Sequence, residues 1–198
     1  MPTEDHQWGV AYPAVFVLDE AGRVVQKRIQ EHYRAREGAV KLLEDALGIA
    51  AATHHQTRRA SAPRVRVSAF VDSDSYVRWQ KTRLHVELHV DPGWHVYGQP
   101  IPAGYTPLAV EVEPQSGLEV GEPVYPPAHP FKVEGLEEQF YVHEGHVRVV
   151  VPIAINVPAG RGEVTVRVTV RHQVCSETEC ISPRESVVEI PLQEAPAA

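Results

Sequence analysis

The chain has 198 residues, of which 43% are hydrophobic and 23% charged, a balance typical of a folded globular protein rather than a disordered one. Its formal net charge of −7 argues against nucleic-acid binding, which requires a basic face. No apolar run approaches the ~20 residues that a membrane-spanning helix needs, so no membrane insertion is expected, and the length allows one large or two small domains.

The first 49 residues predict a small strand–turn–strand–helix unit. Apolar runs at 12–18 and 24–29 predict two strands, and the glycine-containing segment between them predicts a turn. Apolar residues at helical spacing predict a helix from about 37 to 47, which Gly48 ends. This pattern differs from that of the rest of the chain and indicates a separate unit at residues 1–49.

This unit resembles the C-terminal third of a thioredoxin-fold redoxin over residues 8–47. The resemblance rests on the stretch YPAVFVLDEAGRVV at residues 12–25, in which Pro13 matches a proline that is cis and borders the active site in that family. The first half of a redoxin and its catalytic cysteine are absent, so no peroxidase or reductase chemistry is assigned here. Two strands and a helix cannot bury a full thioredoxin core. The unit is therefore part of a longer protein, a cap packed on the second domain, or a piece that completes a thioredoxin fold from another chain.

Residues 50–63 are predicted to be a linker, because they lack a sustained apolar period and carry small and basic residues. From residue 64 to 198, apolar and polar residues alternate in runs separated by glycine and proline, with no convincing helix. Seven to nine such strands in about 130 residues, each with one buried face, predict an immunoglobulin-like antiparallel β-sandwich. The clearest runs are 65–69, 84–90, 108–112, 147–151, 164–170 and 187–192.

The two cysteines of the chain, Cys175 and Cys180, lie within one six-residue window between the alternating runs 164–170 and 187–192. This arrangement predicts a β-hairpin with a thiol on each side of its turn, within the ~4.4–6.8 Å Cα separation that a disulfide demands. A bridge across so short a loop gains less from chain entropy than one across a long loop. The spacing therefore favours a disulfide that opens and closes, with a static structural bridge as the alternative.

Residues 64–193 resemble the N-terminal, periplasmic domain of the thiol–disulfide interchange protein DsbD and its immunoglobulin-like relatives. The resemblance rests on the stretches DPGWHVYG (91–98), EQFY (138–141) and CSETECISP (175–183), on their order and on the all-β context. It implies a dithiol relay that takes electrons from a thioredoxin-like partner and passes them to oxidised thioredoxin-fold redox proteins, with no cofactor.

The resemblance also assigns roles to individual residues. Cys180 matches the cysteine that attacks the partner disulfide and forms the mixed disulfide, and Cys175 then resolves it. The resemblance places a cap over the disulfide, formed by Phe140 with Tyr141 and the preceding Glu138. It also places Trp94, His95 and Tyr97 near the cysteine pair.

The charges near the cysteines predict a thiol that reacts slowly. Glu138, Glu177 and Glu179 would raise the pKa of a nearby thiol, and His172 is the one nearby candidate for a cation. Because thiol exchange needs a thiolate, we expect activation mainly when a partner docks.

The resemblance implies an extracytoplasmic, periplasmic location. The sequence begins without the basic region and apolar core of a signal peptide, which taken alone indicates the cytoplasm or a fragment of a longer secreted chain. We therefore expect the numbered start to lie inside a longer precursor or fusion.

Two alternatives remain beside the relay. The first is a non-enzymatic immunoglobulin-like domain that binds another protein and carries a structural disulfide. The second is a metal site, because the chain has 11 histidines, with His85 and His89 on one predicted strand face and His143 close to His146. Neither pair comes with further ligands at zinc-like spacing, so no metal is predicted.

Overall fold

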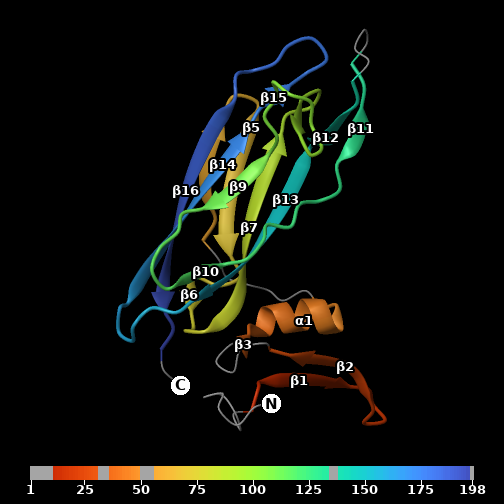
Figure 1. Cartoon of the computed structure of the whole chain (residues 1–198). Helices are drawn as coiled ribbons and strands as arrows, with labels where there is room; N and C mark the ends of the chain where they lie inside the picture. Colours follow the sequence, from red (N-terminus) through yellow and green to blue (C-terminus); the bar gives the residue numbers. More distant parts are fainter. Residues whose placement is uncertain (1–10, 31–35, 50–55, 134–137, 197–198) are drawn as a thin grey trace, which may run out of the picture.

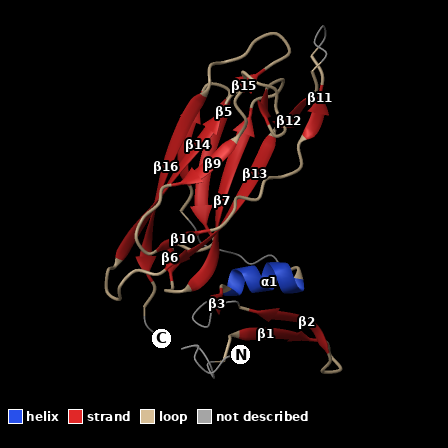
Figure 2. Ribbon diagram, viewed as in Figure 1, coloured by secondary structure: helices blue, strands red, loops and turns tan. Residues whose placement is uncertain are grey.

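The computed structural model describes residues 11–30, 36–49, 56–133 and 138–196. An elongated β-sandwich makes up most of it, and a small unit with the helix lies at one end (Figures 1 and 2). Within these ranges, no helix combines the length and the apolar character needed to cross a membrane. In chain order the elements are β1 (Ala14–Leu18), β2 (Val24–Ile29), β3 (Arg36–Glu37), α1 (Ala39–Leu47), β4 (Arg58–Ala62), β5 (Val65–Val71), β6 (Ser75–Tyr76), β7 (Gln80–Val90), β8 (His95–Tyr97), β9 (Ala109–Val112), β10 (Leu118–Val120), β11 (His129–Phe131), β12 (Phe140–Glu144), β13 (His146–Ile155), β14 (Glu163–His172), β15 (Val174–Cys175) and β16 (Arg184–Glu194).

The predicted immunoglobulin-like antiparallel sandwich is confirmed. Its largest sheet has the order β10-β13-β7-β5-β4, and the facing sheet has the order β6-β16-β14-β9. A third, smaller sheet, β11-β12-β8-β15, forms one end of the molecule. Alternating residues of the long strands meet between the two larger sheets, and valine predominates among them. The alternation in the sequence therefore marks the buried face of each long strand.

The strand count and the linker both differ from the prediction. The sandwich contains more strands than the seven to nine predicted, because its connections contribute short ones such as β6 and β8. The predicted linker 50–63 contains β4, which pairs with β5 along its whole length, and Ala60 packs against the core. Its sequence, RRASA, places an arginine and two small alanines on the partly buried face, so its alternation gives a weak hydrophobic signal. Residues 50–55 lie outside the described residues.

The two arms around the cysteines pair as predicted, but their connection is not a short turn. β14 and β16 form a continuous antiparallel ladder that ends at the pair His172–Arg184. Residues 173–183 then leave this ladder, and β15 adds to β8 in the third sheet, where Cys175 pairs with His95. The cysteines are therefore held by the smaller sheet rather than between the hairpin arms.

The N-terminal unit has the predicted elements and packs on the sandwich. β1 and β2 form an antiparallel hairpin, and α1 ends at Gly48, whose φ of 64° is the left-handed conformation that glycine adopts readily. β3 pairs in parallel with β7, and the backbone N–H of Gly38 donates to the Lys81 carbonyl at 2.9 Å. A side chain at Gly38 would meet that carbonyl and the Gln80 amide within 3.0 Å, so glycine permits this close approach.

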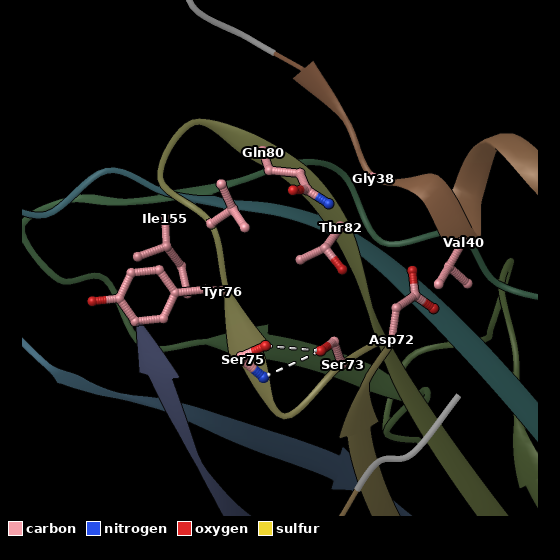
Figure 3. Close-up of a pocket in the computed structure, with 10 residues that line it drawn as sticks. Gly38, Val40, Asp72, Ser73, Ser75, Tyr76, Gln80, Thr82 and Ile155 are labelled. Carbon is pink, nitrogen blue, oxygen red and sulfur yellow. Dashed lines mark hydrogen bonds between the residues drawn. The ribbon is translucent and has the colours of Figure 1, made fainter. Parts of the chain in front are cut away.

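A small cavity of about 110 Å³ lies at this joint, between Gly38 and Val40 on one side and Asp72, Tyr76 and Thr82 on the other (Figure 3). It is smaller than the ~300–1,000 Å³ of typical small-molecule sites. We therefore regard it as a packing gap between the two units.

The Arg83 side chain links the N-terminal unit to the sandwich. Its guanidinium donates to the Asp72 carboxylate at 3.0 Å within the sandwich and to Glu44 of α1 at 2.8 Å. The Arg83 and Asp72 side chains are only 12% and 8% exposed, so the pair is largely shielded from solvent. The network holds α1 against the large sheet.

Replacing Arg83 by methionine should destabilise the protein by about 2–4 kcal/mol, because it leaves the buried Asp72 carboxylate without its guanidinium partner. Urea denaturation followed by circular dichroism measures this loss. Arg167→Met is the matched control: Arg167 pairs with Glu189 on the surface at 50% exposure, so its loss should cost less than about 1 kcal/mol. Equal losses in the two variants would contradict a stabilising role for the Arg83 network.

Candidate functional site: the Cys175–Cys180 disulfide

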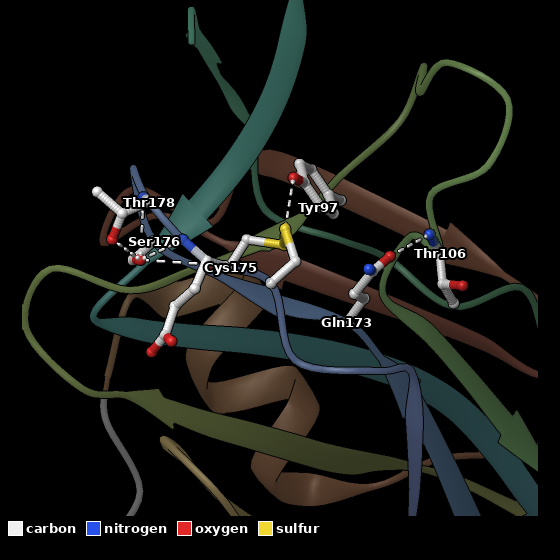
Figure 4. Close-up of a disulfide and its surroundings, with 8 residues drawn as sticks. Tyr97, Thr106, Gln173, Cys175, Ser176 and Thr178 are labelled. Carbon is white, nitrogen blue, oxygen red and sulfur yellow. Dashed lines mark hydrogen bonds between the residues drawn. A yellow bond between two sulfur atoms is a disulfide. The ribbon is translucent and has the colours of Figure 1, made fainter.

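The two cysteines form a disulfide, with an S–S distance of 2.05 Å and a Cα–Cα distance of 4.1 Å (Figure 4). It lies near β15, at the opposite end of the sandwich from α1 (Figure 1). The loop between the cysteines is closed by its own hydrogen bonds. The Ser176 hydroxyl accepts from the backbone N–H groups of Thr178 and Glu179, and the Ser176 N–H donates to the Glu179 carbonyl at 2.8 Å. This loop has hydrogen bonds that do not depend on the S–S bond.

The two cysteines differ sharply in exposure. Cys175 has no exposed surface and belongs to an apolar cluster with Tyr97, Phe140 and Val142. Cys180 is exposed. Thiol–disulfide exchange requires an attacking thiolate to reach a sulfur along a clear path, so Cys180 is the cysteine that an external partner can approach.

Tyr97 contacts the exposed cysteine. Its hydroxyl lies 3.8 Å from the Cys180 sulfur (Figure 4), and its ring packs against Phe140 and Tyr105 with centroids 5.5 and 5.1 Å away. Burial, reinforced by Tyr105, raises the pKa of Tyr97 to about 12. Tyr97 is therefore a neutral phenol at physiological pH, and its O–H can donate to a sulfur that carries negative charge.

His95 lies beside the buried cysteine as its strand partner. The His95 ring contacts Tyr97 and Phe131, with centroid distances of 5.3 and 4.4 Å, and its Nε2 atom has no hydrogen-bond partner within the described residues. Burial lowers the pKa of His95 and outweighs the opposing attraction of Glu144. The imidazole is thus neutral near pH 7 and contributes packing rather than charge.

The expectation that His172 supplies a cation near the disulfide is wrong. His172 is 1% exposed, and its Nδ1 atom lies 3.4 Å from the Val170 carbonyl. Burial lowers the pKa of His172 more than this hydrogen bond raises it, so the neutral form is favoured. The expected acidic residues Glu138, Glu177 and Glu179 are exposed to solvent, where their charges are screened.

The structure brings together only part of the predicted surroundings. Phe140, His95 and Tyr97 lie around the disulfide, as described above. Trp94 instead packs against the main core, with the Arg64 guanidinium 5.1 Å above its ring. Tyr141 follows Phe140 on β12 and so points to the opposite face of that strand, where it is half-buried.

Several residues of the site were not predicted from the sequence. Tyr105 packs edge-on against Phe140 at 4.9 Å, and Phe131 covers His95. The Gln173 side chain accepts a hydrogen bond from the Thr106 N–H at 2.9 Å, which ties the loop that carries Tyr105 to the residue before β15 (Figure 4). Tyr105 lies in the connection between β8 and β9, and Phe131 ends the three-residue strand β11, so neither belongs to a run with hydrophobic periodicity. The aromatic character of these two residues was the available signal.

The buried histidines predict a loss of stability in mild acid. Burial lowers the pKa of His95, His143 and His172 in the folded protein, so the unfolded chain binds protons more readily. Their stabilising effect is complete above the unfolded pKa of about 6.5 and is lost as the pH falls through the folded values. The urea midpoint should therefore drop between about pH 7.5 and pH 5.5. An unchanged midpoint over this range would contradict neutral burial of these side chains.

The Tyr97 hydroxyl predicts a measurable effect on the reduced cysteine. In a Cys175→Ser background, Tyr97→Phe keeps the ring but removes the donor near Cys180, so the thiol pKa should rise and alkylation by iodoacetamide at neutral pH should slow severalfold. Tyr105→Phe removes a hydroxyl from the same cluster and is the matched control, with an unchanged rate expected. If both variants react like the parent, the hydroxyl has no influence on the thiol.

The chain is similar to one known protein family and to several solved structures. A sequence profile of the family described as "Thiol:disulfide interchange protein DsbD, N-terminal" matches residues 67–192, whereas no curated protein sequence matches the chain. The structure is similar to the N-terminal periplasmic domain of ScsB from Proteus mirabilis, with 17% identity, a TM-score of 0.49, and coverage of 70% of this chain and 52% of that one. The chain thus spans about half the length of that ScsB domain.

Two further solved structures are similar at lower TM-scores. The reduced N-terminal domain of DsbD from Neisseria meningitidis has 15% identity and a TM-score of 0.40, covering 71% of this chain and 90% of that one. The GAE domain of GGA2p from Saccharomyces cerevisiae has 10% identity and a TM-score of 0.40, covering 70% and 98%. The family profile covers more than half of the chain and includes the disulfide, and on that basis the chain belongs to the family of DsbD N-terminal domains, which are thiol–disulfide interchange modules.

Proposed function

We propose that the chain relays electrons between thioredoxin-fold proteins through the Cys175–Cys180 pair, acting as a protein-disulfide reductase. The observation that carries this proposal is the unequal exposure of the two sulfur-bearing residues, with Cys175 fully buried and Cys180 exposed. A relay needs one sulfur that meets partners and a second that is shielded from them but within reach of the first. The disulfide between the two residues brings their sulfurs within bonding distance of each other.

The proposed cycle is two successive exchange reactions. In the reduced protein, the Cys180 thiolate attacks one sulfur of a partner disulfide, forms a mixed disulfide, and releases the other partner sulfur as a thiolate. The Cys175 thiolate then attacks the Cys180 sulfur, which restores the internal disulfide and releases the partner as a dithiol. Two electrons pass to the partner, and a reduced thioredoxin-fold donor resets the pair by the same steps in reverse.

Phe140 and its neighbours are proposed to shield the Cys175 sulfur between encounters. Phe140 is fully buried and shares an apolar cluster with Cys175, and Phe131 and Val133 pack against that cluster. Of the other residues of the expected cap, Glu138 is exposed two residues before Phe140, and Tyr141 is half-buried on the opposite face of β12. An apolar cover of this kind limits access by water and by unrelated thiols.

A periplasmic location and a division of roles between the two units are also proposed. The matching ScsB domain is periplasmic, and a dithiol relay suits that compartment, where disulfides form and persist. We assign the relay to residues 64–198, because the disulfide and the cluster around it lie there. Residues 1–49 are then a separate unit, whose described residues (11–30 and 36–49) pack at the far end of the sandwich.

A structural disulfide in a non-enzymatic, protein-binding sandwich is the second candidate. The full burial of Cys175 favours it, because a buried sulfur is protected from reduction by small thiols. The two candidates differ in one property that single cysteine variants reveal, namely whether a partner becomes covalently attached.

The relay predicts opposite behaviour for the two single cysteine variants. Cys175→Ser should accumulate a mixed disulfide with an oxidised thioredoxin-fold protein, since nothing remains to resolve it, and Cys180→Ser should form none. Non-reducing electrophoresis and mass spectrometry of the complex measure this, with the double variant as a blank. Equal trapping by both single variants would overturn the assigned roles, and trapping by neither would favour the structural disulfide.

A further inference from the structure

Three potential metal ligands meet on the outer face of the large sheet. Glu87 and His89 are two residues apart on β7, so both side chains project from the same face. His146, the first residue of β13, is the direct cross-strand partner of His89. From this arrangement we infer that Glu87, His89 and His146 form a binding site for a divalent transition-metal ion, with Zn²⁺ as the ion that the ligand set fits.

The distances bring one donor atom from each side chain into a single small volume. These three atoms all lie within 4.8 Å of one another. The two imidazole rings stack with centroids 4.7 Å apart and an interplanar angle of 15°. Two nitrogens bound to one zinc ion lie about 3.3 Å apart, given tetrahedral bonds of about 2.0–2.1 Å. His89 is exposed and the His146 side chain is 46% exposed, so rotation of the side chains on a fixed backbone closes the remaining gap.

Glu87 is already oriented for this role by a neighbouring arginine. Its Oε1 atom accepts hydrogen bonds from Arg148 Nε and Nη2 at 3.0 and 2.7 Å, whereas its Oε2 atom lies 3.6 Å from the Nε2 atom of His146. One carboxylate oxygen is therefore held in place while the other faces the histidines. Ligand carboxylates in metal sites are commonly oriented by hydrogen bonds of this kind.

The donor set selects the type of ion. Two imidazoles and one carboxylate suit Zn²⁺, Cu²⁺ and Ni²⁺, whereas Mg²⁺ and Ca²⁺ prefer sites made of oxygen ligands. Three protein ligands leave a fourth zinc position for water. The positive charge of Arg148 opposes the bound cation, and Arg66, the β5 partner of His89, adds a second positive charge nearby. The site is therefore expected to bind more weakly than a buried structural zinc site.

Some other histidines of the sandwich differ from His89 and His146 because they are buried. His85, on the same strand, is buried and donates from Nε2 to the Asp72 carboxylate at 2.8 Å, and His143 is buried in β12. Neither is open to a metal ion. A metal on His89 and His146 would fasten β7 to β13 immediately after Gly145, where the chain leaves the sheet that carries the disulfide. Its binding uses no cysteine, so it does not require the disulfide to open.

Isothermal titration of the whole chain with ZnCl₂, after treatment with a chelator, tests the site at about pH 7.5, because protons compete with metal ions for their ligands at lower pH. We expect one equivalent to bind, with affinity lowered by roughly tenfold or more in His89→Ala and in His146→Ala, since each removes a ligand. Binding of Co²⁺ should give the visible absorption of a tetrahedral ion in the parent and lose it in both variants.

His129→Ala is the matched control, because His129 is also exposed, at 52%, and also lies beside a glutamate, Glu144, on a neighbouring strand. It should bind like the parent. Circular dichroism and urea midpoints without metal should be alike for all four proteins, because the substituted side chains lie on the surface. No binding by the parent, or binding that His89→Ala and His146→Ala leave unchanged, overturns the proposal.

Discussion

Burial of alternating valines between two sheets is the constraint on which the rest of the molecule depends. β7, β13 and β14 each turn a row of branched aliphatic side chains inward, and most of these are less than 5% exposed. Such burial contributes about 25 cal/mol per Å² of apolar surface. A shift of one residue in the pairing of two strands would expose a whole row of these side chains to solvent, so the register between the strands is fixed. The outward face of every strand is fixed by the same requirement, and that places Glu87 and His89 together outside.

The disulfide lies beyond this core, in a second cluster with a different composition. Aromatic rings are prominent there, contributed by β8, β11, β12 and the connection that carries Tyr105. The cluster encloses Cys175 but leaves Cys180 exposed, and the groups beside the sulfurs, a phenol and an imidazole, are neutral. The site therefore controls the cysteines through shape and access more than through charge. This is consistent with exchange that begins when a partner docks.

The N-terminal unit depends on the sandwich for its position. Its hairpin leaves Phe16, Leu18 and Ile29 more than half exposed, so its apolar surface is only partly covered. What fastens it to the sandwich is polar, namely the β3–β7 pairing and the Arg83 network with Asp72 and Glu44. A joint of this kind holds the unit at the end opposite the disulfide (Figure 1).

The sequence by itself determined the fold class and the long strands, because a period of two along one strand is a local property of the chain. It also placed Cys175 and Cys180 on one loop, and the family resemblance through residues 91–98, 138–141 and 175–183 indicated the redox class. Only the tertiary structure decided that β15 joins a third sheet, that Tyr105 and Phe131 line the site, and that His172 is neutral. Likewise, His89 meets His146 rather than His85 because register joins β7 to β13 across more than 50 residues of chain. Contacts of this kind arise from packing between distant segments, which no local pattern encodes.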